Sequence, residues 1–167
     1  MGRISGLIVT LLLGCGAKED TAGIEDCQVG DLSGAGQAKF DGNGWAASDG
    51  VWMESGTNIT INLESDTNQN ININAKKGAD GTDVQTLISE SQFPIVIDLS
   101  GDDGFGSVMD LRNGLDGYES SNPGGSGTFV IAGVDGDTLT GCFEFDAVSA
   151  QTQVVIEVRE GQVKIDR

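Results

Sequence analysis

Carboxylates are the residues of this sequence that could most readily do chemistry, because the chain has 26 Asp and Glu residues and no histidine. Glu144 and Asp146 lie two positions apart in an alternating stretch, which would place both on one face of a β-strand. Such a pair can supply the acid and the base of glycoside hydrolysis. Because the same face also carries Cys142 and is expected to be solvated, we interpret the pair as surface charge.

The residues or motifs that form other common catalytic groups are absent from the sequence. Without histidine there is no imidazole to act as a general base, as a triad member or as a zinc ligand. The chain also contains no Gly-x-Ser-x-Gly motif, which would mark a serine nucleophile. We therefore expect no enzymatic activity, no catalytic residue and no cofactor.

A second group of carboxylates, Asp98, Asp102 and Asp103, lies in the acidic stretch 98–104. Carboxylate oxygens are hard ligands of the kind that Ca²⁺ prefers. The spacing does not fit an EF-hand loop, because Asp103 stands where that loop requires glycine. We interpret the stretch as a solvated loop and predict no metal site, with these three carboxylates as the candidates if Ca²⁺ does bind.

Amide side chains form a third pattern, because two alternating stretches at 58–64 and 70–75 would project their polar residues from one face of a hairpin. A ladder of amides could hydrogen-bond a polysaccharide, with Trp52 as the nearby ring that could stack on a sugar. The alternative is a solvated sheet face made of neutral polar residues, and we prefer it. The candidate ligand face consists of Trp52, Asn58, Thr60, Asn62, Asn70, Asn72 and Asn74.

The N-terminal stretch 2–13 combines the positive charge of Arg3 with an apolar run, which is typical of a secretory signal peptide. The run is too short for a membrane-spanning helix, which needs about 20 apolar residues. Its end, Leu-Leu-Gly-Cys at 12–15, resembles the bacterial lipobox. This resemblance implies that acyl chains such as palmitate are attached to the Cys15 thiol and that cleavage occurs before Cys15. The alternative is an ordinary secretory signal with an incidental cysteine.

Three segments follow from this interpretation: a lipoprotein signal peptide at 1–14, a lipidated flexible spacer at 15–37 and one domain at 38–167. The spacer is small, acidic and rich in glycine. The lipobox resemblance places the protein in the bacterial cell envelope, anchored to a membrane without spanning it. By resemblance to the sorting rules of enteric bacteria, the absence of Asp after Cys15 favours the outer membrane.

The formal net charge of -17 limits the partners of this chain. Affinity for nucleic acid comes from Lys and Arg contacts to phosphates, and only 9 Lys and Arg residues are present. An anionic bilayer surface would repel the chain for the same reason. We therefore expect no nucleic acid partner, contact with the membrane only through the lipid, and an unidentified protein or glycan partner.

Cys27 and Cys142 remain once Cys15 is lipidated, which is an even number of cysteines in an oxidising compartment. We therefore predict a disulfide between them. The alternative is that both are free or redox-active thiols, and we prefer the disulfide because neither cysteine lies in a Cys-x-x-Cys motif. The alternation of 139–147 places Phe143 and Phe145 on one face of a strand and Cys142 on the other. The bond would therefore fasten the end of the spacer to the outer face of this strand.

Period-two alternation recurs from about residue 38 to the C-terminus, and no stretch shows a convincing helical pattern. We predict an all-β domain of about nine antiparallel strands, either a sandwich or an up-and-down barrel. A tight turn at 40–45 should point Phe40 and Trp45 inward. The last four strands should form a meander that turns at Glu160-Gly161. The predicted strands are 51–53, 58–64, 70–75, 84–88, 95–99, 108–111, 127–132, 139–147, 153–158 and 162–165.

Two late stretches carry a further resemblance. The run 139–147 contains Gly141, Phe143, Phe145 and Ala147, and a valine-rich strand and a Gly-x-Val at 161–163 follow it. This pattern resembles the C-terminal signature of a functionally uncharacterised family of β-rich bacterial lipoproteins, and the Phe, Asn-Gly and Trp cluster at 40–46 is also similar. The family has no known catalytic residues to transfer, and Cys142 departs from its pattern.

Taken together, these features predict a lipid-anchored cell-envelope protein with a non-enzymatic binding or structural role. The alternatives are a lipocalin-like small-molecule carrier, which needs an internal apolar cavity, and a glycan-binding module.

Overall fold

The computed structural model describes residues 24–111 and 116–167. The predicted signal peptide, Cys15 and the first part of the predicted spacer lie outside the described residues. In chain order the elements are η1 (Ile24–Asp26), β1 (Gly36–Phe40), β2 (Asn43–Ala47), β3 (Asp49–Ser55), β4 (Asn58–Glu64), β5 (Gln69–Ala75), α1 (Val84–Ser89), β6 (Ile95–Asp98), β7 (Gly104–Asp110), β8 (Asp116–Glu119), β9 (Ser126–Asp135), β10 (Thr138–Ser149) and β11 (Val155–Ile165).

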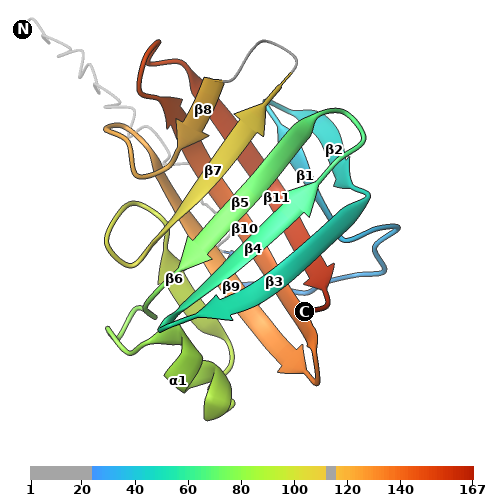
Figure 1. The fold of residues 1–167 in the computed structure, drawn as a ribbon, viewed down its shortest axis with the longest axis vertical. Coiled ribbons are helices and arrows are strands. Elements are labelled where there is room, and N and C mark those ends of the chain that lie inside the picture. Colours follow the sequence, from blue (N-terminus) through green and yellow to red (C-terminus); the bar gives the residue numbers. More distant parts are fainter. Residues whose placement is uncertain (1–23, 112–115) are drawn as a thin grey trace, which may run out of the picture.

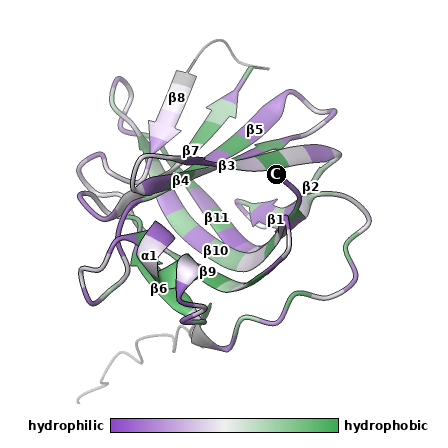
Figure 2. Cartoon of the chain, turned by 60° about the horizontal axis from the view of Figure 1, so that its bottom comes forward, coloured by the Kyte–Doolittle hydropathy of each residue, from purple (hydrophilic) through white to green (hydrophobic). Residues whose placement is uncertain are grey.

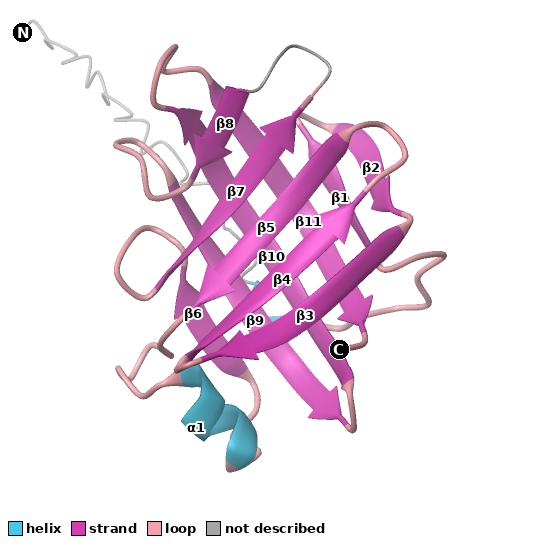
Figure 3. Cartoon of the chain, viewed as in Figure 1, coloured by secondary structure: helices cyan, strands magenta, loops and turns pink. Residues whose placement is uncertain are grey.

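All described strands belong to one antiparallel sheet that nearly closes into a barrel (Figures 1 and 3). Its main path runs β2-β1-β11-β10-β8-β7-β5-β4-β3, while β9 pairs with β10 and β6 pairs with β9. The long strand β10 therefore pairs with β9 along most of one edge and with β8 only at its C-terminal end. The prediction of an all-β domain is confirmed, and of the two predicted architectures the barrel is the one that forms.

The interior of the barrel is filled by the inward-facing side chains of these strands. Hydrophobic and hydrophilic residues alternate along the strands, as Figure 2 shows by colour. The predicted inward residues of the β4–β5 hairpin, such as Ile61 and Ile73, are fully buried and face each other across the strand pair. Phe143 and Phe145 of β10 reach the same core from the opposite wall, with ring centroids 6.2 Å apart.

The β1–β2 hairpin turns at Asp41 and Gly42, which have φ angles of 47° and 80°. Positive φ at both central residues is the mark of a type I′ turn, for which Asp-Gly is a favoured sequence. The tight turn predicted for this stretch is therefore confirmed, although the Asn43-Gly44 pair lies within β2 instead of at the turn. As predicted, Phe40 and Trp45 are both buried, and their rings stack with centroids 5.2 Å apart.

The strand predicted at 84–88 is wrong, because this segment forms the helix α1. Val84 and Leu87 are three positions apart and both are buried, which is the spacing of one helix face. Asp83 occupies the N-cap position, where Asp is a favoured residue, although its side chain makes no capping bond. The helix lies across the lower end of the barrel in Figure 1 and adds its two buried side chains to the core.

The two strands predicted at 153–158 and 162–165 form the single strand β11, so the predicted turn at Glu160-Gly161 is wrong. The pairing of β10 with β11 shifts here, because Phe143 lies opposite Gly161 while Phe145 lies opposite Val158. Two residues of β11 thus stand opposite one residue of β10, which is a β-bulge. Glycine is common in bulges and in turns, so the sequence alone does not distinguish them. The segment forms a bulge because the partner strand β10 continues without interruption.

The barrel wall is incomplete where the two ends of the strand path approach each other. The backbone N–H of Trp52 in β3 donates to the carbonyl of Asp166, just beyond β11, which joins one half of this seam. The N–H of Ser48 donates to the carbonyl of Glu64 at the end of β4. Elsewhere along the seam, β2 pairs with β1 alone. The other edge of β2 faces the β4–β5 turn and has no paired strand among the described residues.

Candidate functional site

A large cavity lies at the end of the barrel opposite α1, in the gap of this seam. It has a volume of about 780 Å³. The walls come from the β1–β2 hairpin, the β4–β5 turn, the ends of β7 and β8, and the beginning of β11. Small-molecule sites in proteins have volumes of about 300 to 1,000 Å³, so the cavity is large enough to hold a ligand.

Two stacked aromatic rings and a chain of hydrogen bonds form the floor of the cavity. The indole Nε1–H of Trp45 donates to the carbonyl of Gln69 at 3.3 Å. The Nε2–H group of Gln69 in turn donates to Oδ2 of Asp110 at 3.2 Å. Because Phe40 stacks on Trp45, the floor combines an apolar surface with polar groups held in fixed positions.

Gln69 and Asp110 are polar residues at inward positions of their strands, which is unusual for a filled barrel. They are only 8% and 6% exposed. In β5 and β7 they continue the inward register of Ile71 and Val108, and they face each other as a cross-strand pair. A buried polar residue needs a hydrogen-bond partner, and each supplies one for the other. The buried polar pair thus marks where the apolar core ends and the cavity begins.

The lining of the cavity is acidic. Asp41 and Asp66 join Asp110 in the lining, and none of the described residues that line the cavity is Lys or Arg. Both rim carboxylates also hold the wall together, because Asp41 accepts the backbone N–H of Glu157 at 2.9 Å and Asp66 accepts the hydroxyl of Ser48 at 2.8 Å. The arrangement therefore favours a neutral or cationic ligand over an anion.

None of these residues is predicted as a site from the sequence. Phe40 and Trp45 are correctly predicted to pack inward, but as core residues. The alternation of the two strands could have identified Gln69 and Asp110 as candidates, since each extends an alternating strand by one more inward position. A polar side chain at such a position calls for a partner or a cavity.

The predicted amide ladder lies on the outer face of the β4–β5 hairpin, away from the cavity. Asn62 lies opposite Asn72, and Thr60 lies opposite Asn74, whose Nδ2–H donates to the Thr60 hydroxyl at 3.2 Å. The structure therefore brings the predicted ladder together, as the alternation required. The remaining members are Asn58, also on β4, and Asn70, which pairs with Glu64.

The prediction that Trp52 is the stacking ring of this ladder is wrong. It is 0% exposed and faces the barrel interior, because in β3 it lies opposite the inward residue Ile61. Its Nε1–H donates to the carbonyl of Asp137 at 2.7 Å, and the Arg167 guanidinium lies 4.4 Å from the ring centroid. The outer face instead carries the exposed side chain of Met53 opposite Thr60 and the half-buried side chain of Phe105 opposite Asn74, so Trp52 is not the ring of this face.

The three calcium candidates are not gathered into a metal site. Within 24–111 and 116–167, no three or more His, Cys, Asp or Glu side chains lie close enough together to hold a metal ion. Asp98 is used in another way, because its Oδ1 accepts the backbone N–H of Ser100 at 2.8 Å. Asp103 accepts the N–H groups of Lys76 and Lys77 through its backbone carbonyl, which joins the loop to the end of β5. Asp102 is in the same loop.

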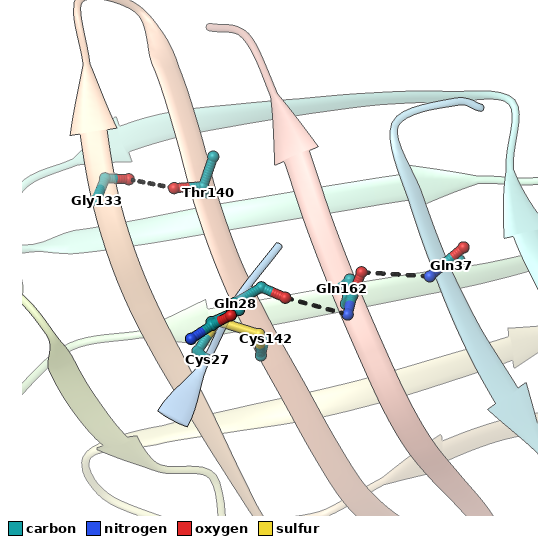
Figure 4. The surroundings of a disulfide bond; sticks show 7 residues. All are labelled: Cys27, Gln28, Gln37, Gly133, Thr140, Cys142 and Gln162. Carbon is teal, nitrogen blue, oxygen red and sulfur yellow. Dashed lines mark hydrogen bonds between the residues drawn. A yellow bond between two sulfur atoms is a disulfide. The ribbon is translucent and has the colours of Figure 1, made fainter. Parts of the chain in front are cut away.

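Cys27 and Cys142 form a disulfide, as predicted, and their Cα atoms are 5.6 Å apart. Cys142 lies on the outer face of β10, where the N-terminal segment covers it (Figure 4). Beside the bond, Gln162 donates its Nε2–H to the carbonyl of Gln28 and accepts the Nε2–H of Gln37. The segment that leads into β1 is thus fastened to β10 covalently and to β11 by hydrogen bonds.

The carboxylate pair Glu144 and Asp146 lies on the same outer face of β10 as Cys142. Asp146 forms an ion pair with Arg159 of β11, with Oδ1 and Nη2 2.5 Å apart. Glu144 lines a pocket beside the disulfide, whereas Asp146 lines neither that pocket nor the cavity at the barrel end, so the two carboxylates do not converge on one cleft, which fits their interpretation as surface charge.

The part of the chain that the structure describes contains no helix long and apolar enough to span a membrane. The chain matches no family model, no curated protein and no solved structure. Membership of the family of β-rich lipoproteins therefore stays a prediction from the late Gly-x-Phe-x-Phe-x-Ala pattern.

Proposed function

We propose that this protein is a lipid-anchored envelope protein that binds a ligand, without enzymatic activity, at the open end of its barrel. The observation that carries the proposal is the cavity of about 780 Å³ with Trp45 and Asp110 on its walls. An apolar floor with a few convergent polar groups is the usual composition of a binding site.

The filled interior argues for binding at the mouth instead of carriage within the barrel. A lipocalin-like carrier encloses its ligand in an apolar cavity between the strands. Here Trp52, Phe143 and Phe145 occupy that space and are almost completely buried. The ligand would therefore stay in contact with solvent at the rim.

The disulfide would limit the distance between the domain and a lipid at Cys15. From Cys15 to Cys27 the chain advances 12 positions (27 minus 15), and an extended chain spans at most about 3.6 Å per residue. A lipid at Cys15 would thus hold β10 within about 40 Å of the bilayer. Neither Cys27 nor Cys142 lines the cavity, so the anchor would leave the cavity accessible.

Titration with the neutral apolar dye Nile red tests the binding site. We expect saturable binding to one site and a change in the fluorescence of Trp45. Val155→Lys should abolish binding, because Val155 lines the cavity and is 45% exposed. Met53→Lys is the matched control, because Met53 is also 45% exposed but lies outside the cavity. Absence of saturable binding, or equal loss in both variants, would contradict the proposed site.

Metabolic labelling with palmitate in a bacterial host tests the anchor. We expect label in the wild-type chain, recovery with the membrane fraction, and loss of both in Cys15→Ser. A soluble, unlabelled wild-type chain would contradict the anchor while leaving the dye result unaffected.

A further inference from the structure

We infer that the ligand of this cavity is an extended polypeptide segment that pairs with the free edge of β2. The inference rests on the proposed function and names the class of its partner. The segment would add a strand to the barrel wall at the point where the wall is incomplete, which is the binding mode known as β-augmentation.

One edge of β2 is unpaired among the described strands. β2 stands at one end of the strand path and pairs with β1 alone. Among the described residues, no other strand forms backbone hydrogen bonds to residues 43–46, and such contacts begin again at Ser48. An edge strand presents a row of N–H and C=O groups that can pair with another chain.

The unpaired edge of β2 lacks the charged residues, proline and bulge that often protect an edge strand. Natural edges are blocked by charged side chains, proline or a bulge, and β2 has the sequence NGWAA with regular pairing to β1. Gly44 and Ala46 also leave the backbone accessible, since a Cβ built at Gly44 would have no atom within 4 Å. The edge is therefore open to an incoming strand.

The shape of the cavity also fits an extended segment. All six residues from 43 to 48 line it, so one complete wall is a strand edge. The five residues of β2 span about 13 Å between the first and the last Cα, at about 3.3 Å per residue. A segment of about four or five extended residues matches this length, whereas a compact ligand would leave most backbone groups of the edge unpaired.

The chemistry of the walls defines the segment further. Side chains on the inward face of an added strand would meet Trp45 and Ile156, and this favours apolar residues at alternate positions. The remaining side chains would lie near the rim, beside Asp41 and Asp66. Because no Lys or Arg lines the described walls, these positions favour basic residues. The expected segment alternates apolar and basic residues.

A library of capped hexapeptides that alternate Val, Ala or Tyr with Lys or Thr tests the inference, with the full-length oxidised protein and displacement of Nile red as the readout. The best member should displace the dye. It should also slow amide hydrogen exchange in β2, and its affinity, measured directly by isothermal titration calorimetry, should fall at least tenfold in Val155→Lys but not in Met53→Lys. Two N-methylated versions of this peptide then test backbone pairing, one methylated at the odd residues and one at the even residues.

Only one N-methylated version should lose binding, at least tenfold, because alternate N–H groups of a strand face the same neighbour. Equal affinity of both versions, or equal loss in both, would overturn the inference. Dye binding without displacement by any peptide would also overturn it and leave the proposed function intact, whereas absence of dye binding would remove both. If the protein instead dimerises through β2, shown by concentration-dependent mass and β2 protection without peptide, the occupant is a second copy and the inference is wrong.

Discussion

Gly161 of β11 packs directly against Phe143 of β10. A Cβ atom built at position 161 would lie 2.4 Å from both the ring Cδ2 and the carbonyl oxygen of Phe143. Because the two residues are a cross-strand pair, neither backbone can move aside without disturbing the sheet. The bulge in β11 and the aromatic core of the barrel therefore depend on the same glycine.

Gly161→Ala should lower the free energy of unfolding by about 1 to 3 kcal/mol, the usual cost of overpacking a core. Chemical denaturation with urea measures the change. Gly117→Ala is the control, because a Cβ at Gly117 in β8 would meet no atom within 4 Å. Equal stability of the two variants would show that the Phe143 ring moves aside at no cost.

Loss of the disulfide should destabilise the domain. Replacing Cys27 and Cys142 by Ser removes a link between residues 115 positions apart, and the chain-entropy model assigns about 4 to 5 kcal/mol to a loop of this size. Unfolding in guanidinium chloride measures the loss, and the wild type under a reducing agent should match the double variant. Nile red binding should remain, because neither cysteine lines the cavity. An unchanged unfolding midpoint would contradict this prediction.

Trp52→Phe should lower stability by about 1 to 3 kcal/mol, because the variant leaves the carbonyl of Asp137 without its indole donor. The ring contact with Arg167 also weakens, since Phe offers a smaller face to the guanidinium. Thermal unfolding followed by circular dichroism measures the effect. Retention on a polysaccharide gel should be the same for the folded variant and the wild type. A folded, equally stable variant with altered retention would contradict this prediction and indicate that Trp52 takes part in glycan binding.

Asn74→Val should leave the free energy of unfolding unchanged or raise it by about 1 kcal/mol. The Oδ1 atom of Asn74 is buried without a hydrogen-bond partner, and an unpaired buried oxygen is a cost that valine removes. Valine also favours a strand. Asn72→Val, two positions earlier on the same face, is the control, and urea denaturation of both variants gives the comparison. A loss of more than about 1 kcal/mol in Asn74→Val alone would show that its bond to Thr60 outweighs the unpaired oxygen.

The sequence predicted local features of this fold better than the way they combine. Alternation identified the inward residues of β4, β5 and β10, because a strand with one buried face must repeat every two residues. It failed at Val84 and Leu87, where a short apolar run fits a helix and a strand equally well. It also failed at Gly161, where a bulge and a turn use the same residue and only the partner strand decides between them.

The cavity could not be predicted in the same way, since its walls come from six separate parts of the chain. Gln69 and Asp110 are 41 positions apart, and only the pairing of β5 with β7 brings them together. The unpaired edge of β2 is likewise a property of the strand order and of no single residue. The amide ladder was predictable because it belongs to one hairpin.

The disulfide also determines how the molecule responds to proteolysis. A single cut of the backbone anywhere between Cys27 and Cys142 divides the chain into two fragments that remain joined by the sulfur bridge. The N-terminal fragment keeps its covalent connection to β10 and β11, which lie in the other fragment. A nicked molecule would therefore migrate as one band on a non-reducing gel and as two after reduction, and whatever holds its N-terminus would still hold both pieces.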